Sequence, residues 1–209
     1  MTFRLHLHLP LRSKRPSVKG SGAPLDAAYY QALHEHSRGY QRNNWLADDP
    51  ALLAAEARSI IELGCGNGRF LERALGHFEK VCGCDWALSP VLMRTLTRHP
   101  ELRFLRLNLI EDALPGGFDL ACSGDFLEHL PTEQLDAVLA RVDACAGSAY
   151  HKIACFDDGH AHLSILPPEE WLARFRRIDP AYALRLDESR RPDQPVAIIT
   201  KGFTTRDGG

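Results

Sequence analysis

A glycine-rich segment that follows a short apolar run constrains the fold of this 209-residue chain most strongly. The segment reads Ile60-Ile61-Glu62-Leu63-Gly64-Cys65-Gly66-Asn67-Gly68-Arg69-Phe70. Its β-branched start predicts a strand over 59–63, and the apolar spacing after it predicts a helix over 69–77. Glycines between a strand and a helix let the backbone approach a ligand where a Cβ would collide, and the helix N-terminus favours negative charge. We therefore expect a ligand-binding loop at the carboxyl end of the strand, where open α/β sheets bind ligands.

Strand and helix patterns alternate along the rest of the chain. Strands are expected at 59–63, 80–84, 102–107, 118–122, 149–155, 183–187 and 196–201, and helices at 25–38, 51–57, 69–77, 89–98, 132–145 and 167–177. Such alternation implies a mainly parallel sheet covered on both faces. Because no helix separates the last two strands, they should be antiparallel neighbours. We expect an α/β fold: a Rossmann-like, seven-stranded, mainly parallel sheet with an antiparallel last strand and helices on both faces.

The chain length favours one domain with extensions, at roughly 150 residues per domain. We divide it into a flexible basic N-terminal tail (1–24), an N-terminal helical cap (25–58), a main domain (59–203) and a flexible tail (204–209). The basic tail is either a solvated terminus or a weak peripheral contact with an anionic membrane surface or a phosphorylated substrate.

Charge and hydropathy exclude several classes of partner. The net charge of −2 gives no pull toward nucleic acid. No apolar run approaches the roughly 20 residues that span a bilayer, and the first ten residues lack a secretory signal, so we expect a cytoplasmic protein. The six cysteines are expected to be reduced and mostly buried, because their spacing fits neither a disulfide framework nor a zinc site.

A dinucleotide-binding loop is the first alternative for the glycine segment. Its G-x-G-x-x-G pattern would place a third glycine at position 69, where this chain has the bulky Arg69. The acidic Glu62 would also repel a pyrophosphate, whereas it suits a cationic group. The segment therefore points away from a dehydrogenase that uses NAD.

The spacing E-x-G-x-G-x-G resembles motif I of the class I S-adenosylmethionine-dependent methyltransferases, in their small bacterial-type form that contains an "LEHL" segment. The resemblance covers roughly 40–201, and its other landmarks occur in order. Asp85 follows the second strand, Asn108 stands where the family usually has Asp against the adenine amino group, and Leu127-Glu128-His129-Leu130 follows the fourth strand. The resemblance implies S-adenosyl-L-methionine as cofactor and S-adenosyl-L-homocysteine as product. It implies a cofactor site made of Glu62, Gly64, Cys65, Gly66, Gly68, Asp85, Trp86, Asn108, Asp125 and Arg42.

Several of these roles have a simpler alternative. Asp85 would accept hydrogen bonds from the two ribose hydroxyls, and the amide oxygen of Asn108 can accept one from adenine. Arg42 would meet the methionine carboxylate, unless this region only packs the cap onto the domain. Trp86 either flanks the adenine ring or belongs to the packing.

The residues beside the acceptor are predicted from residue type and position. His129 is the candidate general base, since an imidazole can take a hydroxyl proton near neutral pH; its alternative is a structural role. Glu128, His160 and His162 are candidate substrate contacts. Asp157, Asp158, His160 and His162 also offer metal-ligand atoms, but their spacing matches no metal signature, so no metal is assigned.

The class of methyl acceptor is narrowed by the absence of a motif after the fourth strand. After the fourth strand, 123–126 reads Ser-Gly-Asp-Phe instead of the Asn/Asp-Pro-Pro-Tyr/Phe run of enzymes that methylate adenine or glutamine. We expect a small-molecule acceptor and no nucleic acid. The "LEHL" segment and Gly159-His160-Ala161-His162-Leu163-Ser164 resemble those of bacterial small-molecule and glycan O-methyltransferases. This resemblance implies O-methylation of a sugar or a lipid-linked glycan as the leading hypothesis. The alternatives are another small metabolite such as a quinone or an amine, and a non-catalytic scaffold with the methyltransferase fold.

Overall fold

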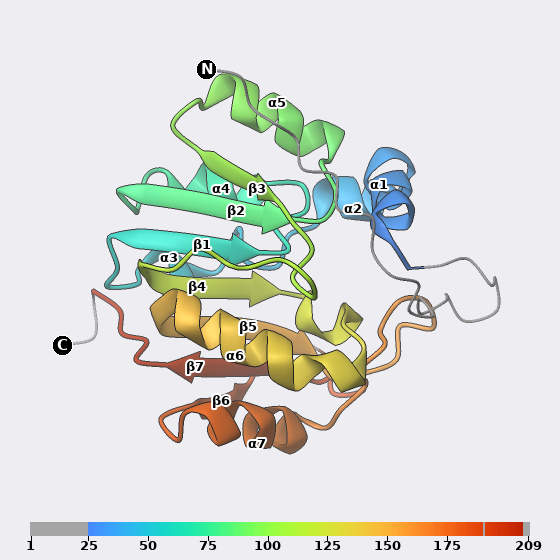
Figure 1. Cartoon of the computed structure of the whole chain (residues 1–209), viewed down its shortest axis with the longest axis vertical. Coiled ribbons are helices and arrows are strands. Elements are labelled where there is room, and N and C mark those ends of the chain that lie inside the picture. Colours follow the sequence, from blue (N-terminus) through green and yellow to red (C-terminus); the bar gives the residue numbers. More distant parts are fainter. Residues whose placement is uncertain (1–24, 190, 207–209) are drawn as a thin grey trace.

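A seven-stranded sheet forms the centre of the computed structural model, which describes residues 25–189 and 191–206 (Figure 1). The strand order is β3-β2-β1-β4-β5-β7-β6. The strands are β1 (Ser59–Leu63), β2 (Lys80–Asp85), β3 (Arg103–Arg106), β4 (Phe118–Gly124), β5 (Ala146–Ala154), β6 (Ala183–Leu186) and β7 (Val196–Lys201). Strands β1 to β5 pair in parallel, and β7 runs antiparallel to β5 and β6. This confirms the predicted fold class and the antiparallel last pair.

Seven helices surround the sheet in the described part of the chain: α1 (Ala27–His36), α2 (Arg38–Arg42), α3 (Pro50–Leu53), α4 (Arg69–Ala74), α5 (Pro90–Arg98), α6 (Leu135–Cys145) and α7 (Pro168–Ile178). Helices α6 and α7 lie in front of the sheet in Figure 1 and α4 lies behind it, while α1 and α2 lie beyond the arrowheads of β1 and β2. The cap therefore lies at the edge where the parallel strands end.

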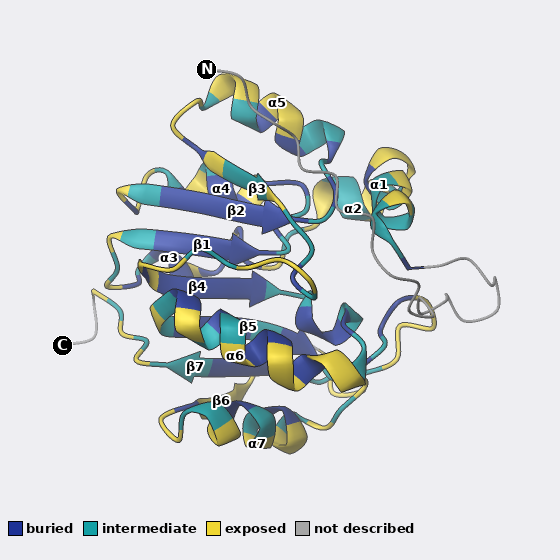
Figure 2. Cartoon of the chain, viewed as in Figure 1, coloured by how far each residue is buried: buried dark blue, intermediate teal, exposed yellow. Residues whose placement is uncertain are grey.

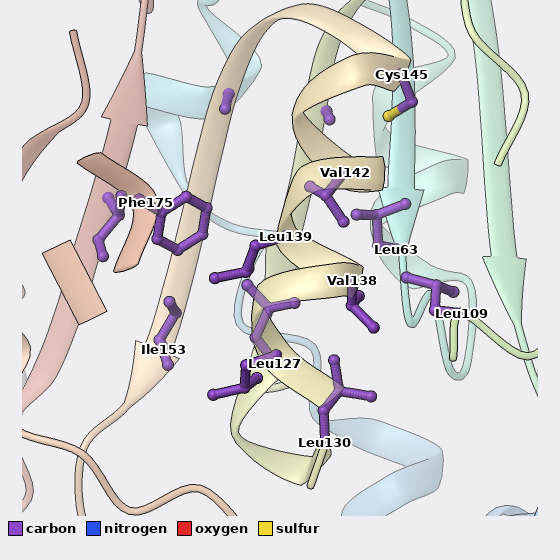
Figure 3. Packing of buried hydrophobic residues seen from close by; sticks show 14 of the residues in the cluster. Leu63, Leu109, Leu127, Leu130, Val138, Leu139, Val142, Cys145, Ile153 and Phe175 are labelled. Carbon is purple, nitrogen blue, oxygen red and sulfur yellow. The ribbon is translucent and has the colours of Figure 1, made fainter. Parts of the chain in front are cut away.

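Two apolar cores, one on each face, follow from the alternation of side chains along the strands. Ile61 and Leu63 face α6 and α7, whereas Ile60 faces α4. Figure 2 shows the central strands buried along most of their length. Figure 3 shows the apolar side chains around α6, among them Leu63, Leu109, Leu127, Leu130, Val138, Leu139, Val142, Cys145, Ile153 and Phe175. Burial on both faces makes the sheet a rigid support for the loops at its carboxyl edge.

The predicted helix over 51–57 was wrong in its extent, because α3 ends at Leu53. Its start is as expected: the Asp49 side chain accepts a hydrogen bond from the Leu52 N–H, and Pro50 occupies the first turn. The chain then leaves the helix to pair with the C-terminal segment. The Glu56 N–H donates to the Thr204 carbonyl (2.9 Å), and the Arg206 N–H donates to the Ala54 carbonyl (2.8 Å).

Residues 204–206, expected in a flexible tail, are thus held against the domain, and 207–209 lie outside the described residues. The predicted basic tail over 1–24, with its membrane contact, also lies outside them. The expected helix over 25–38 is divided at Ser37 into α1 and α2. The other domain boundaries remain predictions.

All six cysteines lie in the described part and have free thiols, and five of them are buried. Among the residues that the structure describes, no helix is long and apolar enough to span a bilayer.

Candidate functional site

A pocket of about 1330 Å³ lies at the carboxyl edge of the sheet, under the cap. The loops after β1, β2, β3 and β4 form its floor, and residues from α1, α2 and the 158–163 loop form its walls. Nine of the predicted site residues line it: Gly64, Cys65, Gly66, Asp85, Trp86, Asn108, Asp125, His129 and His162. The fold therefore brings together side chains that are up to 98 positions apart in the sequence.

The glycine loop has a backbone that other residues rarely adopt. Gly64 has φ +68°, and a Cβ there would lie 2.2 Å from Phe126 Cδ2. Gly68 has φ +73°, and its Cβ would lie 2.5 Å from Leu92 Cδ1. Gly68 is outside the pocket lining and lets the loop pack against α5, whereas Gly64 and Gly66 line the pocket and make room for the side chains of Phe126 and His34. The three glycines thus have different roles.

Asp85, the last residue of β2, fixes the loop from below. Its Oδ2 accepts a hydrogen bond from the Gly66 N–H (2.8 Å), and its Oδ1 accepts one from the Ala87 N–H (2.9 Å). Burial raises the pKa of Asp85, and these hydrogen bonds oppose that effect. Each carboxylate oxygen can accept a second hydrogen bond. Asp85 is therefore available to ligand hydroxyls.

The cap is joined to the glycine loop by polar contacts. The side-chain amide of Asn67 donates to the carbonyls of Tyr40 (3.0 Å) and Asn43 (2.7 Å). One guanidinium nitrogen of Arg69 donates to the carbonyl of Arg42 (2.6 Å). The polar residues of the segment therefore hold the cap in place above its glycines.

Glu62 and Arg42, predicted to contact the cofactor, lie outside the pocket lining. Glu62 is buried and accepts a hydrogen bond from the Asn44 side-chain amide (3.1 Å), so it supports the cap from beneath. Burial raises the pKa of its carboxyl well above the usual value. For Arg42, the backbone carbonyl makes the contact with Arg69.

Asn108 and Trp86 lie in the lining at the β2–β3 side. The Asn108 side-chain oxygen accepts a hydrogen bond from the Ile110 N–H (3.0 Å), and its own N–H donates to an Asp112 carboxylate oxygen (2.7 Å). Asn108 thus shapes the turn after β3, and one acceptor position of its amide oxygen is already in use. The Trp86 ring centroid lies 6.4 Å from that of Tyr30 in α1.

His129 and His162 line the opposite side of the pocket. The His129 Nδ1 lies 3.1 Å from the Ala161 carbonyl, and the His162 Nδ1 lies 2.7 Å from the Phe156 carbonyl. Because a carbonyl only accepts, each Nδ1 carries the proton and donates, which leaves each Nε2 as an acceptor. Burial lowers the pKa of His129 to about 4, so its imidazole is neutral at pH 7.

Glu128 and His160, predicted as substrate contacts, are not in the lining. Glu128 is fully buried, and its Oε1 accepts a hydrogen bond from the Ala154 N–H (3.1 Å). Its backbone carbonyl accepts from the N–H groups of Leu163 and Ser164 (both 2.9 Å), which attaches the 155–164 loop. His160 is exposed, and its ring contacts the Tyr29 hydroxyl.

Two pocket residues of α1, Tyr30 and His34, were not predicted. Because they are four positions apart, both lie on one face of the helix. Polar or aromatic side chains on the face that packs against the domain are the sequence feature that could have identified them. The His34 Cε1 lies 3.3 Å from the position of a Gly66 Cβ. Burial lowers the pKa of His34. The cap therefore contributes side chains to the site as well as covering it.

Comparison with protein-family models found a match in the central part of the chain. Residues 61–148 match a family model described as a methyltransferase domain. A search of curated proteins found no match to this sequence.

Three solved structures with the same fold illustrate the structural matches. The first is a 1,6-didemethyltoxoflavin-N1-methyltransferase from Burkholderia thailandensis with bound 1,6-didemethyltoxoflavin and S-adenosylhomocysteine, with 17% identity over 83% of this chain and 85% of that chain, TM-score 0.65. The second is the N-methyltransferase NodS from Bradyrhizobium japonicum WM9 in complex with S-adenosylhomocysteine, with 16% identity over 85% and 98%, TM-score 0.59. The third is an O-methyltransferase family protein from Burkholderia thailandensis, with 18% identity over 83% and 58%, TM-score 0.56.

The sequence match covers the segment from β1 to the start of β5, which includes the glycine loop, Asp85 and the 127–130 segment. The structural matches cover 83–85% of this chain, so they extend the likeness in fold to the rest of the domain. Residues 61–148 are therefore similar to a methyltransferase domain, and the chain shares its fold with structures of S-adenosylmethionine-dependent methyltransferases.

Proposed function

We propose that the protein transfers a methyl group from S-adenosylmethionine to a hydroxyl of a small molecule, namely a sugar or a lipid-linked glycan. One observation carries this proposal: a single pocket has the glycine loop and Asp85 on one side and His129 and His162 on the other. Its volume of about 1330 Å³ exceeds the roughly 300–1,000 Å³ typical of a pocket for one small ligand. There is room for a nucleoside cofactor and an acceptor together.

The residues beside the glycine loop fit the cofactor. Gly64 and Gly66 line the pocket, and their lack of side chains makes room for Phe126 and His34, which line the pocket beside them. The Asp85 carboxylate suits a pair of ribose hydroxyls, because it is an acceptor with free lone pairs. When bound, S-adenosylmethionine supplies an activated methyl group. The protein's contribution is then to align the acceptor and to exclude water, which the cap over the pocket serves.

His129 is our candidate for the acceptor's proton. Its Nε2 is free to accept, since Nδ1 faces the Ala161 carbonyl. With a pKa of about 4 the imidazole is a weak base, but it is neutral at pH 7 and ready to accept. A hydroxyl becomes strongly acidic as its oxygen bonds to a methyl carbon. A weak base in place is therefore sufficient late in the reaction.

N-methylation of a small amine is the second candidate. Two of the similar structures are the 1,6-didemethyltoxoflavin-N1-methyltransferase and the N-methyltransferase NodS. A neutral amine also needs less help from a base, which would leave His129 with a role in shaping the pocket. Replacing His129 separates the two candidates.

The test is an acceptor screen with S-adenosylmethionine labelled in its methyl group. Panels of free sugars, lipid-linked glycans, quinols and amines are incubated with the wild-type protein and with His129→Asn. We expect label on an oxygen of a saccharide and at least a tenfold lower rate in the variant, since general bases contribute roughly 100-fold or more. Transfer to nitrogen at an unchanged rate in the variant would support the second candidate. No transfer by protein that binds the cofactor would favour a scaffold.

A further inference from the structure

We propose that Glu128, His129 and His162 bind a divalent transition-metal cation at the acceptor side of the pocket. These residues, here called the Glu-His-His cluster, come from the 127–129 turn after β4 and from the loop after β5. One ligand-type atom of each lies within 4.8 Å of those of the other two. The cation site itself does not depend on the proposed function, whereas the catalytic role given to it below rests on the proposed O-methylation.

The distances are those of a site that needs only a small contraction. His162 Nε2 lies 3.9 Å from Glu128 Oε1, and the ring centroids of His129 and His162 are 5.0 Å apart. A first-row cation bound at roughly 2.0–2.2 Å from each ligand holds neighbouring ligand atoms about 3–3.5 Å apart. Side-chain rotations that move these atoms by less than about 1 Å complete such a site.

The orientation of both imidazoles is the one that metal-binding histidines adopt. Each Nδ1–H donates to a backbone carbonyl, Ala161 for His129 and Phe156 for His162. A metal-ligating histidine almost always gives its second ring N–H to such a partner, which fixes the ring and leaves the other nitrogen for the cation. The Phe156 and Ala161 carbonyls belong to the same loop as His162, so one loop orients both rings.

Glu128 supplies a carboxylate ligand. It is fully buried, and while Oε1 accepts from the Ala154 N–H, Oε2 has no hydrogen-bond partner among the described residues. Buried carboxylates are normally paired with a cation or bound to a metal. Asp158 adds a second carboxylate at the rim: its Oδ2 lies 3.8 Å from His162 Nε2, and Asp158 lines the pocket. A divalent cation would balance both charges.

The donor set selects the kind of cation. Two imidazole nitrogens and a carboxylate oxygen suit Mn²⁺, Fe²⁺, Co²⁺, Ni²⁺ or Zn²⁺, whereas Mg²⁺ and Ca²⁺ prefer oxygen ligands alone. His129 and His162 line the pocket, so the side of the cluster facing it is free for an acceptor oxygen. Three protein ligands with an open position are typical of a catalytic metal site.

The cation would assist methyl transfer by binding the acceptor hydroxyl. It lowers the pKa of that hydroxyl, and the proton passes to Asp158 or to water. The acceptor oxygen then forms its bond to the methyl carbon, while the carbon–sulfur bond breaks and leaves its electron pair on the sulfur. With the cation bound, His129 Nε2 is a ligand, so direct proton transfer to His129 belongs to the metal-free protein only.

The test is calorimetric titration of the metal-free protein with Mn²⁺, supported by the visible absorption of bound Co²⁺. We expect one cation per chain, with binding weakened more than about 100-fold in Glu128→Gln and in His162→Asn. The asparagine in His162→Asn has an amide donor near the position of the histidine Nδ1, so it can keep the hydrogen bond to the Phe156 carbonyl. It has no atom in place of Nε2, so the proposed metal ligand is lost. His99→Ala is the matched control and should bind as the wild type does. In the wild-type protein the His99 imidazole lies 3.5 Å from Glu72 and 3.3 Å from Glu101. These three residues are far from the Glu-His-His cluster in the sequence.

S-adenosylhomocysteine is titrated into the same preparations. A variant that keeps this binding is folded, so its loss of cation binding reports on the site; if Glu128→Gln does not fold, His162→Asn decides. No cation binding by wild-type protein that binds S-adenosylhomocysteine would overturn the metal site and leave the proposed function intact. Binding equally strong in His162→Asn, or lost in His99→Ala, would also overturn it. Absence of S-adenosylhomocysteine binding with a cation bound would instead contradict the proposed function.

Discussion

Asn67 should stabilise the cap more than any other single side chain of the glycine loop. Its amide donates to the Tyr40 and Asn43 carbonyls, and its oxygen accepts from the Arg69 N–H (3.1 Å). Asn67→Ala removes all three hydrogen bonds. At about 1 kcal/mol net for each, the free energy of unfolding should fall by about 3 kcal/mol. Asn67 is only 2% exposed, so water does not replace the lost hydrogen bonds.

Urea unfolding followed by circular dichroism measures this loss, and calorimetry with S-adenosylhomocysteine measures its effect on the pocket. Asn67→Asp is the companion variant: it keeps the acceptor for the Arg69 N–H, but it replaces the two donors to the cap with a carboxylate oxygen that faces the Tyr40 and Asn43 carbonyls. Asn67→Asp should therefore weaken ligand binding as Asn67→Ala does, since Tyr40 and Asn43 line the pocket. A loss below about 0.5 kcal/mol in Asn67→Ala, with unchanged ligand affinity, would refute this account of the cap.

Three further predictions concern the rest of the fold. Gly64→Ala should lower the free energy of unfolding by about 2–4 kcal/mol, because of its positive φ and the clash with Phe126; a urea midpoint equal to that of the wild type would contradict this. Burial lowers the pKa of His151 to about 3. Between pH 6.5 and 3 the unfolded state therefore binds more protons than the folded state. The free energy of unfolding should decrease as the pH is lowered through this range, by up to about 1.4 kcal/mol per pH unit. His151→Asn, which can keep the contact with Ser123, should flatten this slope, and parallel curves would argue against it. Arg206→Ala should cost about 1 kcal/mol in urea unfolding, since its side chain donates to the Ala57 and His77 carbonyls, and no change would indicate a free tail.

Most of the sheet could be predicted from local patterns. The apolar runs before Gly64 and Asp85 are short but β-rich and clearly bounded, so β1 and β2 were found within one residue of their ends. The end of α3 could not be found this way. Its start depends on Asp49 and Pro50, which are local signals, but its end depends on pairing with Thr204, about 150 residues later. The local helix propensity of residues 54–57 is outweighed by such non-local pairing.

The candidate site was predictable where a residue follows a strand. Asp85 and His129 are in this class, and both line the pocket. The polar contacts between elements were not predictable, because a sequence does not say which side chain lies opposite which. Glu62 illustrates this: its position before the glycines suggested a ligand contact, whereas the structure pairs it with Asn44 of the cap.

Binding of S-adenosylhomocysteine, measured by titration calorimetry, tests the central claim most directly. Wild-type protein and Asp85→Asn are compared, with NADH as a control ligand. The amide retains the size of the side chain and removes the charge that should hold the ribose hydroxyls. The account predicts one molecule bound per chain with micromolar affinity, at least about tenfold weaker in Asp85→Asn, and no binding of NADH. Failure of the folded wild-type protein to bind S-adenosylhomocysteine, or equal affinity in the variant, would contradict it.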